Sequence, residues 1–158
     1  MAWSMRRRSV RRHSPTIVGM DRRRLLAGVS AAQLAVGLTG MAVAVRRSRP
    51  YDFLILHGRA DRVGRDSIAM GTPLSAPPAM LVAQGVATGV LARRSSPPAE
   101  RVLAGLGAAM VVGYLGESLV RRRLRPSGFD GVESPLAVAG TALAAAMPIM
   151  ARGVGGRR

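Results

Sequence analysis

The chain has 158 residues, of which 48% are hydrophobic and only 3% are aromatic. A soluble core of this size normally relies on several large aromatic side chains, whereas tightly packed membrane helices favour small residues. The net charge of +16 comes from 24 arginines without a lysine, and the lack of cysteine excludes disulfides, thiolate chemistry and cysteine-based metal sites.

The arginines gather at the borders of apolar stretches rather than within them. The borders are residues 22–24, 46–47, 93–94 and 121–123, together with Arg152. Charges that flank apolar segments are typical of membrane spans, whereas a nucleic-acid-binding domain carries its basic residues on one face. We therefore expect a membrane protein without a nucleic-acid partner, with its arginines near lipid headgroups, anionic ones in particular.

The first two elements differ in how regular they are. Residues 1–24 are basic and predict a disordered arm, in which Met20 is an alternative start. Residues 25–45 are uncharged and long enough to cross a bilayer core of about 30 Å. This stretch also exceeds the apolar part of a signal peptide, which is about 7–15 residues, so we expect a retained span. The next uncharged stretch, 67–92, contains prolines that should leave its first half kinked or non-helical: Pro73, Pro77 and Pro78.

Two further stretches complete the pattern. Residues 102–120 are charged only at Glu117, and residues 134–151 are uncharged and precede a short basic tail, 152–158. The prediction is an all-α, polytopic membrane protein in which residues 25–151 form four transmembrane helices.

Two arginine-rich segments indicate a possible duplication. Residues 45–50 read VRRSRP and residues 120–126 read VRRRLRP, and each is followed by an acidic segment and a Pro-Leu pair. Two duplicated helical hairpins would form a parallel repeat with both arginine-proline loops on one side of the membrane. The alternative is a chance similarity in an arginine-rich composition.

The distribution of arginine also predicts an orientation. With the amino terminus inside the cell, the inner side carries 14 arginines and the outer side 10. The positive-inside rule then places both termini in the cytoplasm of a multi-pass protein of the cell membrane. A start at Met20 would change the counts to 9 and 10 and remove this bias.

The third predicted span carries a regular row of small residues. Gly105, Ala109 and Gly113 recur every four residues, and Gly116 and Glu117 continue the row. Small residues at this spacing let two helix backbones approach closely, so we expect this face to meet another helix.

Three polar residues lie within the predicted spans. Glu117 precedes Arg121 by four residues, which is the spacing of a helical ion pair. Gln33 and Gln84 lie near the middles of the first two spans, where a buried amide should bond to another helix. The alternative hypothesis is a polar pocket for a ligand, lined by all three.

The loop 46–66 contains the remaining candidates: Asp52, His57, Asp61 and Asp66. They could form a metal or acid–base site, but no pair shows zinc-type histidine spacing and interleaved arginines would occupy the carboxylates. We favour an interfacial structural loop and expect neither a metal nor a cofactor.

The sequence lacks a phosphate-binding glycine loop, a nucleophile elbow and an HExxH motif. We therefore expect a non-enzymatic membrane component that binds partner helices or lipid, either as a homo-oligomer or with another membrane protein. Two alternatives remain open. One is a small transporter subunit with a midplane polar site at Gln33, Gln84 and Glu117. The other is a membrane-interface enzyme that acts through Asp52, His57 and Asp61.

Overall fold

The computed structural model describes residues 17–47, 52–53, 56–57 and 72–152, and their side chains in 22–47 and 72–152. The named elements of the described chain are helices apart from one short antiparallel pairing of β1 (Asp52–Phe53) with β2 (Leu56–His57), in which Asp52 lies opposite His57. The predicted all-α class is therefore confirmed for this part of the chain.

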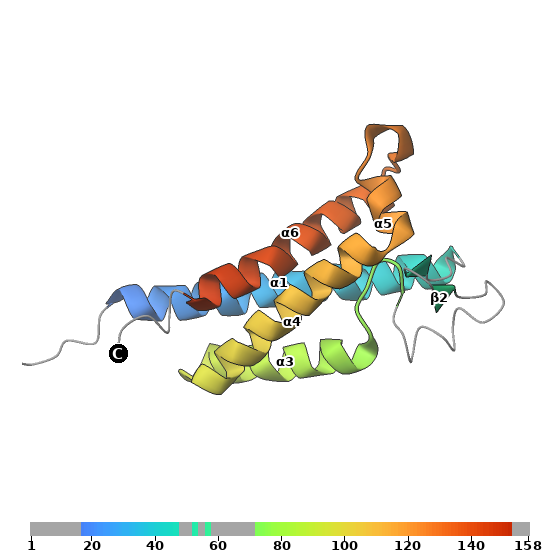
Figure 1. Ribbon diagram of the computed structural model, residues 1–158. Coiled ribbons are helices and arrows are strands. Elements are labelled where there is room, and N and C mark those ends of the chain that lie inside the picture. The colour runs from blue at the N-terminus through green and yellow to red at the C-terminus, as the bar shows by residue number, and fades with distance from the viewer. Residues whose placement is uncertain (1–16, 48–51, 54–55, 58–71, 153–158) are drawn as a thin grey trace, which may run out of the picture.

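Four helices form an antiparallel bundle, shown in Figure 1: α1 (Ile17–Arg46), α3 (Pro78–Arg93), α4 (Pro97–Gly116) and α6 (Glu133–Arg152). Helix α1 packs on α3 and α6, and α4 packs on the same two helices. Helix α1 begins where α6 ends, and α3 ends where α4 begins, at the left of Figure 1. We call this the termini end; the opposite end carries α5 (Ser118–Arg123) and the short 3-10 turn η2 (Pro126–Gly128).

Three of the four helices are long and apolar enough to cross a membrane: Arg22–Arg46 of α1, Pro97–Gly116 and Glu133–Arg152. Helix α3 has 16 residues and is shorter. It begins at Pro78, where a proline fits the first helical turn because its missing N–H would have no helical partner. Residues 72–77, in the first half of the predicted stretch 67–92, are thus not helical, as the prolines of this stretch indicate.

The non-helical segment 72–77 is nevertheless packed into the bundle. Thr72 and Ser75 exchange two backbone hydrogen bonds of 3.1 Å, and Leu74 between them is 2% exposed. The backbone of Leu74 approaches Gly40 of α1 so closely that a side chain at position 40 would collide with the carbonyl oxygen of Leu74. The segment therefore covers the last turns of α1 at the opposite end.

Two element boundaries differ from the sequence prediction. Helix α1 begins at Ile17, so the last residues of the predicted arm are helical, in keeping with the helix propensity of arginine. Helix α4 ends at Gly116, because Glu117 is extended (φ −77°, ψ 127°), and the predicted span 102–120 is broken there. Helix α6 agrees with the predicted span 134–151 to within one residue.

The interior consists of two apolar clusters. The first lies at the termini end and comprises Leu26, Ala27, Ala87, Leu91, Ala99, Leu103 and Met147. The second lies towards the opposite end and comprises Leu74, Leu81, Met110, Tyr114, Val120, Ala137 and Ala144. Apolar side chains also face outward from every long helix, among them Leu38, Val82, Val112, Val138 and Ile149. Apolar surface on all sides of a bundle is typical of a protein that lies in lipid.

The predicted packing face of α4 needs a correction within this chain. Gly105 and Ala109 are exposed, and a Cβ atom placed at Gly105 or Gly113 would have no neighbour within 4 Å. Helix α4 instead packs on α6 through Gly107, where a Cβ atom would lie 2.6 Å from the carbonyl oxygen of Ala144. Small residues occur on several faces of α4, so their spacing did not identify the face that packs.

Candidate functional site

The two buried glutamines of the sequence prediction meet between α1 and α3. Nε2 of Gln84 donates to Oε1 of Gln33 over 2.8 Å and to the carbonyl oxygen of Ser30 over 2.9 Å. Neither glutamine is exposed at all. Each mid-span amide therefore makes the predicted hydrogen bond to another helix, and the structure adds that the two amides bond to each other.

Three hydroxyl groups extend this contact into a layer across the bundle. Nε2 of Gln33 donates to Oη of Tyr114 on α4 over 3.4 Å. Oγ of Ser30 and Oγ1 of Thr88 lie 2.7 Å apart, and Thr88 also donates to the backbone oxygen of Gln84. We call these five residues the polar layer: Ser30, Gln33, Gln84, Thr88 and Tyr114. It lies between the two apolar clusters and links α1, α3 and α4.

Helix α6 contributes space to the polar layer rather than a polar group. A Cβ atom at Gly140 would lie 3.0 Å from Oη of Tyr114. Glycine at this position thus lets the phenol reach Gln33. Oε1 of Gln84 is buried and has no hydrogen-bond donor among the described residues, so the layer retains one unused acceptor.

Glu117 does not join the glutamines. It is 5% exposed and lies at the break between α4 and α5, three residues beyond Tyr114. The backbone N–H of Arg121 donates to the carbonyl oxygen of Glu117 over 3.1 Å, so the two residues keep the helical spacing, and an ion pair between their side chains stays a prediction. The guanidinium of Arg121 donates to the carbonyl oxygens of Leu115 and Gly116, over 2.9 and 2.5 Å, and satisfies acceptors at the end of α4.

Little of the loop 46–66 is described. Asp52 and His57 are backbone partners in the β1–β2 pairing, which brings the two positions together, but their side chains lie outside the described residues. Asp61 and Asp66 lie outside them entirely. The hypothesis of an acid–base or metal site in this loop therefore stays a prediction.

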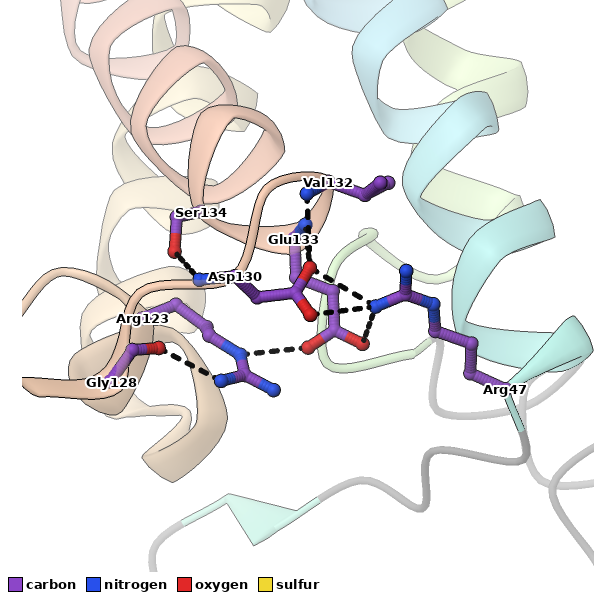
Figure 2. A network of polar contacts seen from close by, with 7 residues as sticks. All are labelled: Arg47, Arg123, Gly128, Asp130, Val132, Glu133 and Ser134. Carbon is purple, nitrogen blue, oxygen red and sulfur yellow. Dashed lines mark hydrogen bonds and ion pairs between the residues drawn. The ribbon is translucent and has the colours of Figure 1, made fainter.

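A second group of polar side chains closes the opposite end of the bundle (Figure 2). Nη1 of Arg47, just after α1, lies 3.0 Å from Oδ1 of Asp130 and 3.0 Å from Oε1 of Glu133. Nε of Arg123 on α5 lies 2.8 Å from Oε2 of Glu133. Glu133 is completely buried, and among the described residues Arg47 bonds to one of its carboxylate oxygens and Arg123 to the other. We call these four residues the ion-pair cluster.

Asp130 also caps the first turn of α6. Its Oδ1 accepts from the backbone N–H groups of Glu133 at 2.8 Å and Val132 at 3.0 Å. Oγ of Ser134 accepts in turn from the backbone N–H of Asp130. These backbone hydrogen bonds, with a smaller part from the Arg47 guanidinium, lower the pKa of Asp130 to about 2. Hydrogen bonds to Glu133, and then to Asp130, raise the pKa of Arg47 above its usual value.

Sequence reasoning missed most members of these two groups. Arg47 and Arg123 belong to the similar segments 45–50 and 120–126, and these two arginines lie at one end of the bundle, where both pair with Glu133. The duplication itself stays a prediction. Asp130, three residues before Glu133, fits a helix-cap pattern that would have flagged both carboxylates.

Glu100 is a further buried carboxylate that we did not anticipate. It lies in the first turn of α4 at the termini end, is 7% exposed, and its Oε1 has no hydrogen-bond donor among the described residues.

Comparison with known proteins adds no assignment to this geometry. No protein-family model, no curated protein and no solved structure matches the chain.

Proposed function

We propose that this chain is a four-span protein of the cell membrane, with both termini in the cytoplasm, and that it serves as a non-enzymatic component that binds a partner helix or lipid. One observation carries the proposal. Gln33, Gln84 and Tyr114 in the interior bond to one another, while apolar side chains face outward from all four long helices. In such a bundle the buried polar groups hold the helices together, and the apolar surface is left to contact lipid or another helix.

The fourth span is α3 together with segment 72–77. Sixteen helical residues extend about 24 Å, which falls short of a hydrocarbon core of about 30 Å. The buried turn around Leu74 adds the missing depth beside α1. Non-helical backbone is tolerated at that depth because it is buried in protein and bonds to itself through Thr72 and Ser75.

The partner helix that we propose is α4 of a second copy. The row of Gly105, Ala109 and Gly113 faces away from the other helices, and the large side chains of Val112 and Leu115 beside it are exposed. Two such rows can pack backbone to backbone within the bilayer.

Engineered cysteines test this contact, because the chain has none of its own. We expect Ala109→Cys to form disulfide-linked dimers in membranes under mild oxidation. Three exposed alanines on the other helices are matched controls and should not cross-link: Ala35, Ala83 and Ala142. Equal cross-linking at all four positions, or none at Ala109, would exclude a homodimer through α4.

The transporter alternative has one observation in its favour, the unused Oε1 of buried Gln84. Reconstitution into liposomes separates the two functions. If Gln84→Leu or Glu117→Gln abolishes a solute or proton flux while the protein still assembles, the proposal of a component that only binds a partner helix or lipid is wrong. The enzyme alternative rests on loop side chains outside the described ones, and its test is His57→Ala against a measured turnover.

A further inference from the structure

Exposed arginines from all four long helices converge at the termini end. The apolar cluster around Leu26, Leu91 and Leu103 holds these helix ends together, with Ala151 of α6 packed against it. The exposed arginines there, which we call the termini-end arginines, are Arg22, Arg24, Arg93, Arg94, Arg101 and Arg152.

These six arginines are not neutralised within the described part of the chain. They make no ion pair there, and the acidic side chain described at this end, Glu100, is 7% exposed. A seventh arginine, Arg23, is half-buried and donates to the carbonyl oxygen of Leu91 over 3.2 Å, which ties α1 to the end of α3. The termini end therefore presents a strongly positive ring.

The opposite end differs although its described part has almost as many arginines. Arg47 and Arg123 pair with Asp130 and Glu133, and Arg121 binds backbone carbonyls. Three exposed arginines remain without such contacts among the described residues: Arg46, Arg122 and Arg125. Among the described residues, the two ends thus differ in unneutralised charge more than in arginine content.

Apolar side chains next to the termini-end arginines indicate what kind of anion fits. Leu25 follows Arg24 and is 57% exposed, and Val102 follows Arg101 and is 43% exposed. On α6, Ile149 is 70% exposed, three residues before Arg152. A ligand that contacts both kinds of group needs a phosphate next to a hydrocarbon chain, which a lipid has and free phosphate lacks.

We propose that the termini-end arginines bind the phosphate groups of anionic lipid headgroups, so that this end faces the leaflet richer in anionic lipid. A guanidinium binds phosphate through paired N–H donors, and each arginine close to an anionic surface strengthens the attraction. The inference rests on the membrane-spanning arrangement proposed above. It does not depend on the start site, because all six arginines follow Met20.

The test compares two triple variants that remove equal charge. The first is Arg93→Gln/Arg94→Gln/Arg101→Gln at the termini end, and the matched control is Arg46→Gln/Arg122→Gln/Arg125→Gln at the opposite end. Each protein is reconstituted into bilayers of phosphatidylcholine mixed with phosphatidylglycerol, and native mass spectrometry counts the lipids that stay bound. We expect the termini-end variant to lower the retained phosphatidylglycerol relative to phosphatidylcholine, on the order of five-fold per arginine. The control should lower it by a much smaller factor.

Several results would overturn the inference. One is an unchanged lipid ratio in the termini-end variant, and another is an equal loss of retained phosphatidylglycerol in both variants. A third is displacement of phosphatidylglycerol by the same concentration of inorganic phosphate. The fourth is a bound nucleic acid that only the termini-end variant loses. Alkaline extraction of the membranes gives a separate readout. A chain that is extracted does not span the bilayer, and then the proposed function itself has failed.

Discussion

Nη1 of Arg47 lies 3.0 Å from Oε1 of Glu133, although 86 positions separate the two residues in the chain. The other carboxylate oxygen of Glu133 receives Arg123, so one buried carboxylate joins the ends of α1, α5 and α6. A buried charge is tolerated when each of its oxygens has a charged partner, and removal of either side leaves an uncompensated group. The ion-pair cluster should therefore contribute to the stability of the bundle more than an exposed pair would.

Replacement of the buried carboxylate tests this role. We expect Glu133→Gln to lower the free energy of unfolding by about 3 kcal/mol, since two arginines then face a neutral amide. Thermal or denaturant unfolding in detergent micelles, followed by circular dichroism, measures the loss. Arg122→Gln is the control, because Arg122 is exposed and such surface changes are within about 0.5 kcal/mol. A Glu133→Gln protein as stable as the original would show that the cluster is not a stabilising contact.

Acid should weaken the cap on α6 over a defined pH range. The pKa of Asp130 lies at about 2 in the folded protein against 3.8 ordinarily, so the folded state favours the carboxylate. Its contribution to stability is present above the ordinary pKa and is lost as the pH falls toward about 2. We expect the melting temperatures of the original protein and of Asp130→Asn to differ at about pH 5 and to converge near pH 2. A difference that stays constant over this range would contradict the assignment.

The amide contact in the polar layer should appear as a coupling energy. In a double-mutant cycle of Gln33→Leu and Gln84→Leu, we expect the two effects to be non-additive by about 0.6–1.7 kcal/mol, the range for hydrogen bonds within membranes. Thr141→Val provides the comparison, because the Thr141 hydroxyl bonds within its own helix to the oxygen of Ala137. Its effect should add to that of Gln84→Leu. Additivity within the glutamine pair would mean that the 2.8 Å contact contributes nothing to stability.

Two glycines should respond to the same substitution with opposite signs. Pro148 has no N–H to donate, so the oxygen of Ala144 is left without a helical donor and Gly107 lies against it. Gly107→Ala should lower the free energy of unfolding by about 1–3 kcal/mol, because its Cβ atom would overlap this backbone. Gly89→Ala on α3 has open space and should raise it by about 0.5–1 kcal/mol. The same melting experiments decide, and a neutral Gly107→Ala would contradict the close packing of α4 on α6.

Much of the bundle followed from local properties of the sequence. Uncharged length and arginine borders predicted α1, α4 and α6, and the prolines at 73, 77 and 78 predicted the late start of α3. The contact between Gln33 and Gln84 was also predictable, since a lone amide in an apolar span needs a partner on another helix.

Other features depend on tertiary contacts that a single sequence does not display. The end of α4 at Gly116 involves the arginine that binds its last carbonyls, and periodicity alone continues the helix through Glu117. The face of α4 that packs on α6 contains Gly107, which lies against the carbonyl oxygen of Ala144, whereas Gly105 has no such neighbour. The pairing of Glu133 with Arg47 could not be predicted, because the two residues are 86 positions apart.

If α3 crosses the membrane as a fourth span, the connecting segments before and after it lie on opposite sides of the bilayer. Single cysteines replace Ser48 after α1, Ser95 between α3 and α4, and Ser127 between α5 and α6, in a chain that has no other cysteine. A membrane-impermeant maleimide is then applied to sealed vesicles from one side. We expect Ser48→Cys and Ser127→Cys to label from the same side and Ser95→Cys from the other. Labelling of Ser48→Cys and Ser95→Cys from one side, with Ser127→Cys on the other, would mean that α3 does not cross the membrane.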